Sequence, residues 1–302
     1  MSQHRDHDRD RTASIRSGTT GVAAHLWTHT QPVETVAVAG ALATVFTVAL
    51  VRLALNAPVS LPSAVADAYD VVTTAALVGP ALAALCLGVT SDRLPSRVGY
   101  LCLGVFALLT TLTSSLSIPA GVALVARGAL AASSRPIRRT SRSSVVAGLF
   151  AVAVVLALGS AVGVLAVSLR SVGTTAWLVG LACTPLLTHP RRSDLLLGVA
   201  VAGGVLASGV VAPFVTGAVA LVGFAVVGAP FVLVALGVGG VIAALASAVR
   251  AGQRRRAVGL GLLLFAGVPA TMPRALAVVL GFTLLVDASH LMSDGLAGGD
   301  DR

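Results

Sequence analysis

The chain has 302 residues, of which 56% are hydrophobic and 11% are charged. Soluble domains contain about 45 to 50% apolar and about 25% charged residues, so the composition excludes an ordinary soluble protein. The formal charge is +9, but the basic residues form short groups between long apolar segments, without the interleaved aromatic residues typical of a nucleic-acid surface. We therefore expect the charge to orient the chain in a membrane, and nucleic acid is not an expected partner.

Residues 1–32 are predicted to form a cytoplasmic, disordered tail. The segment MSQHRDHDRDRTASIRSG mixes charged and small residues and contains no apolar run, a composition too polar to form a core. The first apolar run begins near Val33 and is longer than the about 7 to 15 apolar residues of a cleaved signal peptide. This run is expected to stay in the membrane as the first span.

Residues 33–287 are predicted to form an all-α, polytopic transmembrane bundle of about ten spans, within a range of about eight to ten, because one span needs about 20 apolar residues. The apolar runs lack the alternation of barrel strands. Cytoplasmic loops are enriched in Arg, so an even number of spans should separate successive Arg groups. This condition gives five helical hairpins, at residues 33–90, 98–132, 144–188, 195–249 and 257–286. Residues 288–302 follow as a short polar tail.

The arginine distribution predicts a multi-pass protein of the plasma membrane with a cytoplasmic N-terminus. In the five-hairpin scheme most of the basic residues are cytoplasmic, whereas Arg52, Arg170 and Arg274 lie outside. Arg127 falls within a span, and its long side chain is expected to reach the inner interface. Four arginines of the loop SSRPIRRTSRS are expected to contact anionic lipid headgroups: Arg135, Arg138, Arg139 and Arg142.

Turn residues predict where the hairpins fold back. Outer turns are expected in the segments NAPVSLPSAVADAYD and SLRSVGTT, and between residues 212 and 230. In the fifth hairpin, Gly267, Pro269 and Pro273 interrupt the apolar run next to Arg274. A single kinked helix would place Arg274 at mid-membrane at a cost of at least about 2.5 to 3.5 kcal/mol, which is comparable with the cost of thinning the bilayer around two short helices. Two short helices are predicted, because the Gly and Pro residues coincide with the break.

Aromatic and small residues give two further expectations. Four polar aromatics fall near the predicted span ends, where such rings prefer the headgroup layer: Trp27, Tyr69, Tyr100 and Trp177. Small residues four apart allow helices to approach closely and favour a compact bundle or self-association: Gly159 with Gly163, and Gly240 with Ala244 and Ala248.

No catalytic, cofactor-binding or metal site is predicted. His25 and His29 stand four residues apart, but no third ligand is evident, and they are expected to be interfacial residues. The trio of Asp287, His290 and Asp294 lies where the last span meets water and has the same interpretation. The three cysteines are each inside an apolar run, which favours buried, inert thiols: Cys86, Cys102 and Cys183.

A short segment between the second and third predicted spans resembles a motif of major facilitator transporters. GVTSDRLPSR, residues 88–97, has a Gly, an Asp-Arg pair four residues on, and a closing Arg97. The family's central Gly and penultimate basic residue are Pro and Ser here, and no second copy occurs half a chain later. The resemblance implies a cytoplasmic turn between two helices. The alternative is a turn in which Asp92 and Arg93 cap those helices.

The expected function is that of a non-catalytic accessory or scaffold subunit, and the alternative is a small-solute transporter or permease. Proton-coupled transport needs a titratable group at depth, but Glu34, Asp67 and Asp70 all lie at span edges. A polar central cavity would favour transport, whereas an interior filled with Val, Leu and Ala would favour a scaffold. Expected partners are the bilayer, other membrane proteins or a second copy. The lack of Lys and the excess of Ala, Val and Gly resemble proteins from GC-rich genomes, such as those of halophilic archaea.

Overall fold

The computed structural model describes residues 33–57, 62–91, 94–112 and 141–287, and within these ranges the chain is helical, with no strand. An N-terminal helix, Val33–Leu55, comes first. The following elements are α2 (Ser63–Thr90), α3 (Leu94–Leu112), α5 (Ser141–Ala161), α6 (Leu169–Ala182) and the 3₁₀ turn η1 (Thr184–Leu187). The second half contains α7 (Arg192–Val211), α8 (Pro213–Ala218), the π-helical turn η2 (Val219–Gly223), α9 (Phe231–Arg250), α10 (Arg254–Ala266) and α11 (Met272–Asp287).

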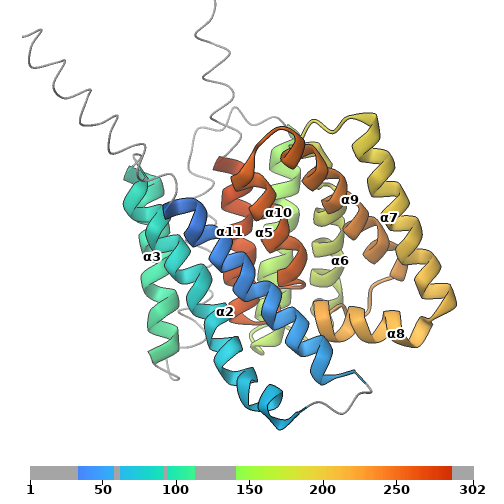
Figure 1. Ribbon diagram of the computed structural model, residues 1–302, viewed down its shortest axis with the longest axis horizontal. Helices are drawn as coiled ribbons and strands as arrows, with labels where there is room; N and C mark the ends of the chain where they lie inside the picture. The colour runs from blue at the N-terminus through green and yellow to red at the C-terminus, as the bar shows by residue number, and fades with distance from the viewer. Residues whose placement is uncertain (1–32, 58–61, 92–93, 113–140, 288–302) are drawn as a thin grey trace, which may run out of the picture.

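Successive helices pack as antiparallel hairpins, so their connections gather at two ends of one bundle (Figure 1). The connections before α3, α7 and α10 lie at one end, which we call the basic end because it carries most of the described arginines. Connections before α2, α6, α9 and α11 lie at the opposite end, together with α8. This arrangement confirms the predicted hairpins at 33–90, 144–188, 195–249 and 257–286 as pairs of helices. For the hairpin at 98–132, only α3 belongs to the described residues.

Helix α11 occupies the centre of the bundle. Its residues from Arg274 to Leu285 are buried except for the half-buried Phe282, and it contacts α10, α2 and α5. A helix that is apolar on all sides is stable only when it is enclosed. Because other helices surround α11, its short length does not have to match the thickness of the bilayer. The shortness of the fifth hairpin is therefore a consequence of its central position.

The break between α10 and α11 occurs at Gly267, which has φ +66° and ψ −160°. Residues other than glycine rarely adopt this backbone conformation. A Cβ at this position would also lie 2.7 Å from the carbonyl oxygen of Phe224. The next residue, Val268, donates its backbone N–H to the same oxygen at 2.8 Å. The prediction of two short helices is confirmed, and Arg274 lies near the start of α11, not at the middle of a kinked helix.

Glycines let three helix pairs approach closely. A Cβ on Gly198 of α7 would lie 2.5 Å from the carbonyl oxygen of Gly239 in α9, and the reverse distance is also 2.5 Å. Gly259 of α10 and Gly281 of α11 face each other in the same way. The prediction for Gly240 is confirmed, because a Cβ there would lie 2.8 Å from the backbone of α6.

Three expectations for α5, α6 and the turn between them are wrong. Gly163 lies after α5 with φ +81°, where it ends the helix in a left-handed conformation instead of packing against a neighbour. The turn therefore covers residues 162–168, and the segment predicted as a turn forms the start of α6. Trp177 is also not interfacial: it is 1% exposed and contacts Phe150 with ring centroids 5.2 Å apart. Helix α6 lies between α5 and α9, which explains this burial.

Five described helices are long and apolar enough to cross a bilayer: Val33–Leu55, Asp67–Thr90, Ser144–Ala161, Arg192–Val211 and Phe231–Arg250. Ser96–Leu109, Pro213–Gly223 and Met272–Leu285 are shorter apolar helices. Several residues with expectations lie outside the described ranges: Trp27, His25, His29, Asp92, Arg93, Arg127, Arg135, Arg138, Arg139, His290 and Asp294. The tails 1–32 and 288–302 also lie outside them.

Candidate functional site

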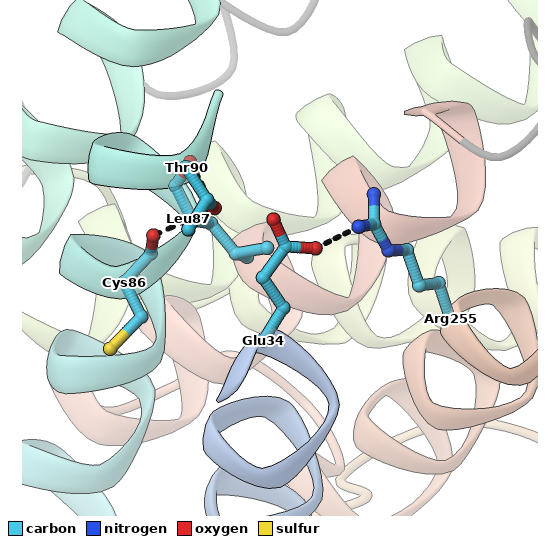
Figure 2. Close-up of polar contacts among 5 residues, drawn as sticks. All are labelled: Glu34, Cys86, Leu87, Thr90 and Arg255. Carbon is cyan, nitrogen blue, oxygen red and sulfur yellow. Dashed lines mark hydrogen bonds and ion pairs between the residues drawn. The ribbon is translucent and has the colours of Figure 1, made fainter. Parts of the chain in front are cut away.

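The basic end of the bundle is held by two ion pairs that join distant parts of the sequence. Glu34, at the start of the N-terminal helix, pairs with Arg255 of α10, as Figure 2 shows. Asp194 in the first turn of α7 accepts a hydrogen bond from Nη1 of Arg250 at 2.7 Å and another from the backbone N–H of Arg191 at 2.9 Å. Both carboxylates are buried, so these pairs satisfy charges that would otherwise be costly to remove from water.

Three arginines from separate elements come together at the opposite end, and we call them the arginine cluster: Arg52, Arg170 and Arg274. Arg52 lies in the last turn of the N-terminal helix, Arg170 in the first turn of α6, and Arg274 in the first turn of α11. Arg52 and Arg274 line one cavity, and Arg170 lies near enough to Arg274 for its charge to be felt there. These are the same three arginines that the sequence placed on the outer side.

Hydrogen bonds hold the cluster but leave several donors without a partner. Arg52 donates from Nε to the Tyr69 hydroxyl at 3.1 Å, and Arg274 donates from Nη2 to the carbonyl oxygen of Gly223 at 3.2 Å. The buried atoms Nη1 of Arg274, Nε of Arg170 and Oγ1 of Thr73 have no hydrogen-bond partner among the described residues. No carboxylate among the residues that the structure describes forms an ion pair with any of the three arginines.

A small cavity lies next to the cluster, with a volume of about 30 Å³. One water molecule needs about 10 to 15 Å³, so the cavity has room for about two waters or a few ligand atoms. Its polar wall comes from Arg52, Thr73 and Arg274. The remaining lining is apolar or backbone: Val45, Val48, Ala49, Ala76, Gly223, Phe265, Ala266 and Pro273. The polar groups thus gather at one side of an otherwise apolar cavity.

The chemistry of this site is that of anion binding. Guanidinium groups keep their proton at any physiological pH and offer several N–H donors in a fixed plane. Arg52 and Arg274 line the cavity, and among the described residues no carboxylate pairs with either of them. An anion in the cavity would offset both their mutual repulsion and their unbalanced charge. The same groups are poor general acids or bases because they do not exchange protons in the working pH range.

The carboxylates weighed as transport groups lie elsewhere. Glu34 is in the ion pair at the basic end, and Asp67 and Asp70 are exposed on α2 and do not line the cavity. Among the described residues, no group of three or more His, Cys, Asp or Glu side chains is placed to hold a metal ion. The packed centre around α11 consists mainly of Ala, Val and Leu.

Sequence reasoning found each arginine of the cluster but not their convergence. Each was interpreted as an isolated exception to the cytoplasmic enrichment of Arg. A usable signal was present, because all three lie within one turn of a helix end on the same predicted side. Residues 88–90 form the end of α2 and residues 94–97 the start of α3, with Arg97 exposed.

Comparison with known protein families matches residues 34–286 to an integral membrane family of unknown function, DUF8068. The chain belongs to this family. The match supports a multi-pass membrane protein and agrees with the several apolar helices of the bundle. No curated protein and no solved structure matches the chain. The resemblance of residues 88–97 to major facilitator transporters therefore has no support beyond those ten residues.

Proposed function

We propose that this DUF8068 protein is a non-catalytic accessory subunit of the plasma membrane that binds a small anionic group at the arginine cluster. The observation that carries the proposal is that Arg52, Arg274 and Thr73 form the polar wall of one cavity, where Nη1 of Arg274 and Oγ1 of Thr73 are buried without a partner among the described residues. Binding is favoured over catalysis because the guanidinium groups cannot exchange protons. The packed centre of Ala, Val and Leu favours binding over transport, since transport needs a polar route between the two ends.

We further propose the ten-span topology with a cytoplasmic basic end. Arginines at that end outnumber those at the opposite end among the described residues, as cytoplasmic loops require: Arg97, Arg142, Arg191, Arg192, Arg250, Arg254, Arg255 and Arg256, against Arg52, Arg170 and Arg274. The fourth span of this topology falls on residues 113–140, outside the described residues. The arginine cluster would then face the outer side.

Cysteine labelling tests this orientation. Gln253→Cys and Asn56→Cys are introduced separately after the native cysteines are replaced by alanine, and intact cells are treated with a membrane-impermeant maleimide. Asn56→Cys is expected to react in intact cells, whereas Gln253→Cys should react only after the membrane is opened, because the two sites lie at opposite ends. Reaction of both sites in intact cells, or the reverse pattern, would contradict the proposed orientation.

Anion-dependent stability tests the binding proposal. Inorganic phosphate is titrated into the purified full chain in neutral detergent, against a chloride series of equal ionic strength, and thermal unfolding is followed. Phosphate is expected to raise the unfolding temperature of the wild type, because an anion that binds the folded state stabilises it. Arg274→Gln and Arg52→Gln should reduce this response.

Arg192→Gln is the matched control, because Arg192 is exposed at the basic end. It should respond to phosphate as the wild type does. The binding proposal would be refuted if phosphate raised the unfolding temperature equally in Arg192→Gln, Arg52→Gln and Arg274→Gln. Uptake of labelled phosphate into proteoliposomes, if it depended on Arg274, would favour transport instead.

A further inference from the structure

We infer that the bound anion fastens the distal turns of the N-terminal helix, residues 49–55, to α11, so that occupancy of the cavity controls whether this helix is fully seated in the bundle. This inference rests on the proposed anion binding and goes beyond it by naming what the site regulates. It follows from a difference between the two ends of the helix. An ion pair within the chain holds the end at Glu34, whereas two arginines line one cavity at the end with Arg52.

The N-terminal helix is held firmly at the basic end. Glu34 pairs with Arg255 of α10 (Figure 2), and the Glu34 side chain is buried. Val38 and Ala41, about one and two turns further along, are also buried. Separating the helix from α10 here would leave a buried carboxylate without its cation, which is strongly unfavourable. This end therefore stays seated whether or not the cavity holds an anion.

The middle of the helix is held by side-chain packing. A Cβ on Gly79 of α2 would lie 2.5 Å from Oγ1 of Thr44, so the two helices cross closely at this point. Phe46 contacts Phe265 of α10 edge to face, with ring centroids 4.7 Å apart. Fewer residues are buried in the N-terminal helix than in α2, α5 or α9, so its attachment depends on a small number of such contacts. They position the helix up to the level of Phe46 without a ligand.

The distal turns have a weaker attachment. Arg52 and Arg274 line one cavity, and no carboxylate among the described residues pairs with either. Their like charges repel each other across the cavity, which pushes the end of the helix away from α11. The hydrogen bond that Arg52 donates goes to the Tyr69 hydroxyl of α2, not to α11. The distal turns are therefore the part of the helix that most needs a ligand to stay in place.

An anion in the cavity turns this repulsion into a link. Arg274 and Thr73 line the cavity, and their atoms Nη1 and Oγ1 are buried without a hydrogen-bond partner among the described residues. Arg52 uses Nε for its bond to Tyr69, and its guanidinium carries two further nitrogens. Only a few acceptor atoms need to enter, which a cavity of about 30 Å³ allows. One anion bound by these three side chains joins the N-terminal helix, α2 and α11, as an internal ion pair does at the basic end.

Hydrogen–deuterium exchange of the full chain in neutral detergent tests the inference, with mass spectrometry to locate the exchanging amides. Inorganic phosphate at about ten times its midpoint concentration is compared with chloride at equal ionic strength. Exchange of residues 49–55 is expected to slow about tenfold, because an anion that binds only the seated form makes opening rarer in proportion to its occupancy. Residues 34–41, held by the Glu34–Arg255 pair, should exchange at an unchanged rate. Arg52→Gln should abolish the difference, whereas Arg192→Gln should retain it.

Thr73→Asp provides the converse test by placing a carboxylate of the chain in the cavity. Its charge should balance Arg52 and Arg274 as the anion does, so residues 49–55 should exchange slowly without phosphate and respond little when phosphate is added. Thr73→Asn has the same shape without the charge and should remain fast in the absence of phosphate. Thr74→Asp puts the same charge on the exposed neighbouring position, which does not line the cavity, and should behave as the wild type.

The outcomes separate the fastening of the helix from the binding of the anion. If phosphate raised the unfolding temperature but slowed exchange equally in residues 34–41 and 49–55, or in neither, the fastening would be overturned and the anion site would stand. Fast exchange of residues 49–55 in a folded Thr73→Asp would also overturn it. If this variant did not fold, the comparison of the wild type with Arg52→Gln would decide alone. No response of exchange or unfolding temperature to phosphate would refute both proposals.

Discussion

Gly198→Ala is expected to destabilise the bundle by about 2 to 3 kcal/mol, because the added methyl group has no space between α7 and α9. Its carbon would lie 2.5 Å from the carbonyl oxygen of Gly239 and 2.8 Å from the methyl group of Ala243. A backbone oxygen cannot move aside as a flexible side chain can, so the two helices would have to separate. Unfolding in mixed detergent micelles, followed by circular dichroism, measures the effect.

Gly203→Ala provides a control on the same helix. A Cβ at Gly203 meets nothing within 4 Å, and alanine is a better helix former than glycine by about 0.5 to 1 kcal/mol. This variant should therefore be as stable as the wild type or slightly more stable. If the two alanine variants unfolded alike, the close crossing of α7 and α9 would be refuted.

Arg250→Gln is expected to cost about 3 kcal/mol by leaving Asp194 without its cation. The Asp194 side chain is 1% exposed, whereas that of Arg250 is 36% exposed. Breaking a buried pair costs about 3 to 5 kcal/mol, and the partial exposure of Arg250 places this pair at the lower end. The hydrogen bond from the Arg191 backbone remains, but it does not neutralise the carboxylate. Thermal unfolding in detergent measures the loss.

A second substitution shows whether the unpaired charge is the cause. Asp194→Asn in the Arg250→Gln background removes the buried charge and should recover part of the lost stability, so the two changes should not be additive. Arg192→Gln, two residues before Asp194 and exposed, should have little effect. Full additivity of the two substitutions would contradict the ion pair as a source of stability.

The hairpin arrangement could be predicted from the sequence because local features determine it. Charged residues cannot remain in hydrocarbon, so each Arg group marks a connection. Gly267 and the prolines after it likewise marked the break before α11, because glycine and proline limit the helix wherever they occur. These signals depend on residues close together in the chain and are therefore readable without a structure.

The arginine cluster and the burial of Trp177 could not be predicted, because both depend on which hairpins become neighbours. Arg52 and Arg170 approach Arg274 only when the N-terminal helix, α6 and α11 come together in the folded bundle. Trp177 looked interfacial because the turn before α6 was placed several residues too late. The Gly198–Gly239 crossing was missed for a related reason, since glycine is so common in this chain that spacing alone does not identify the few that touch another helix.

The central position of α11 has a consequence for how the protein is made. Among the described helices α11 is synthesised last, yet α2, α5 and α10 all pack against it. While ribosomes are still translating the chain, the earlier hairpins must remain apart in the bilayer, or open again, to admit it. The centre of the bundle is therefore filled only when α11 is inserted. A nascent chain that stops before Met272 lacks the helix against which α2, α5 and α10 pack.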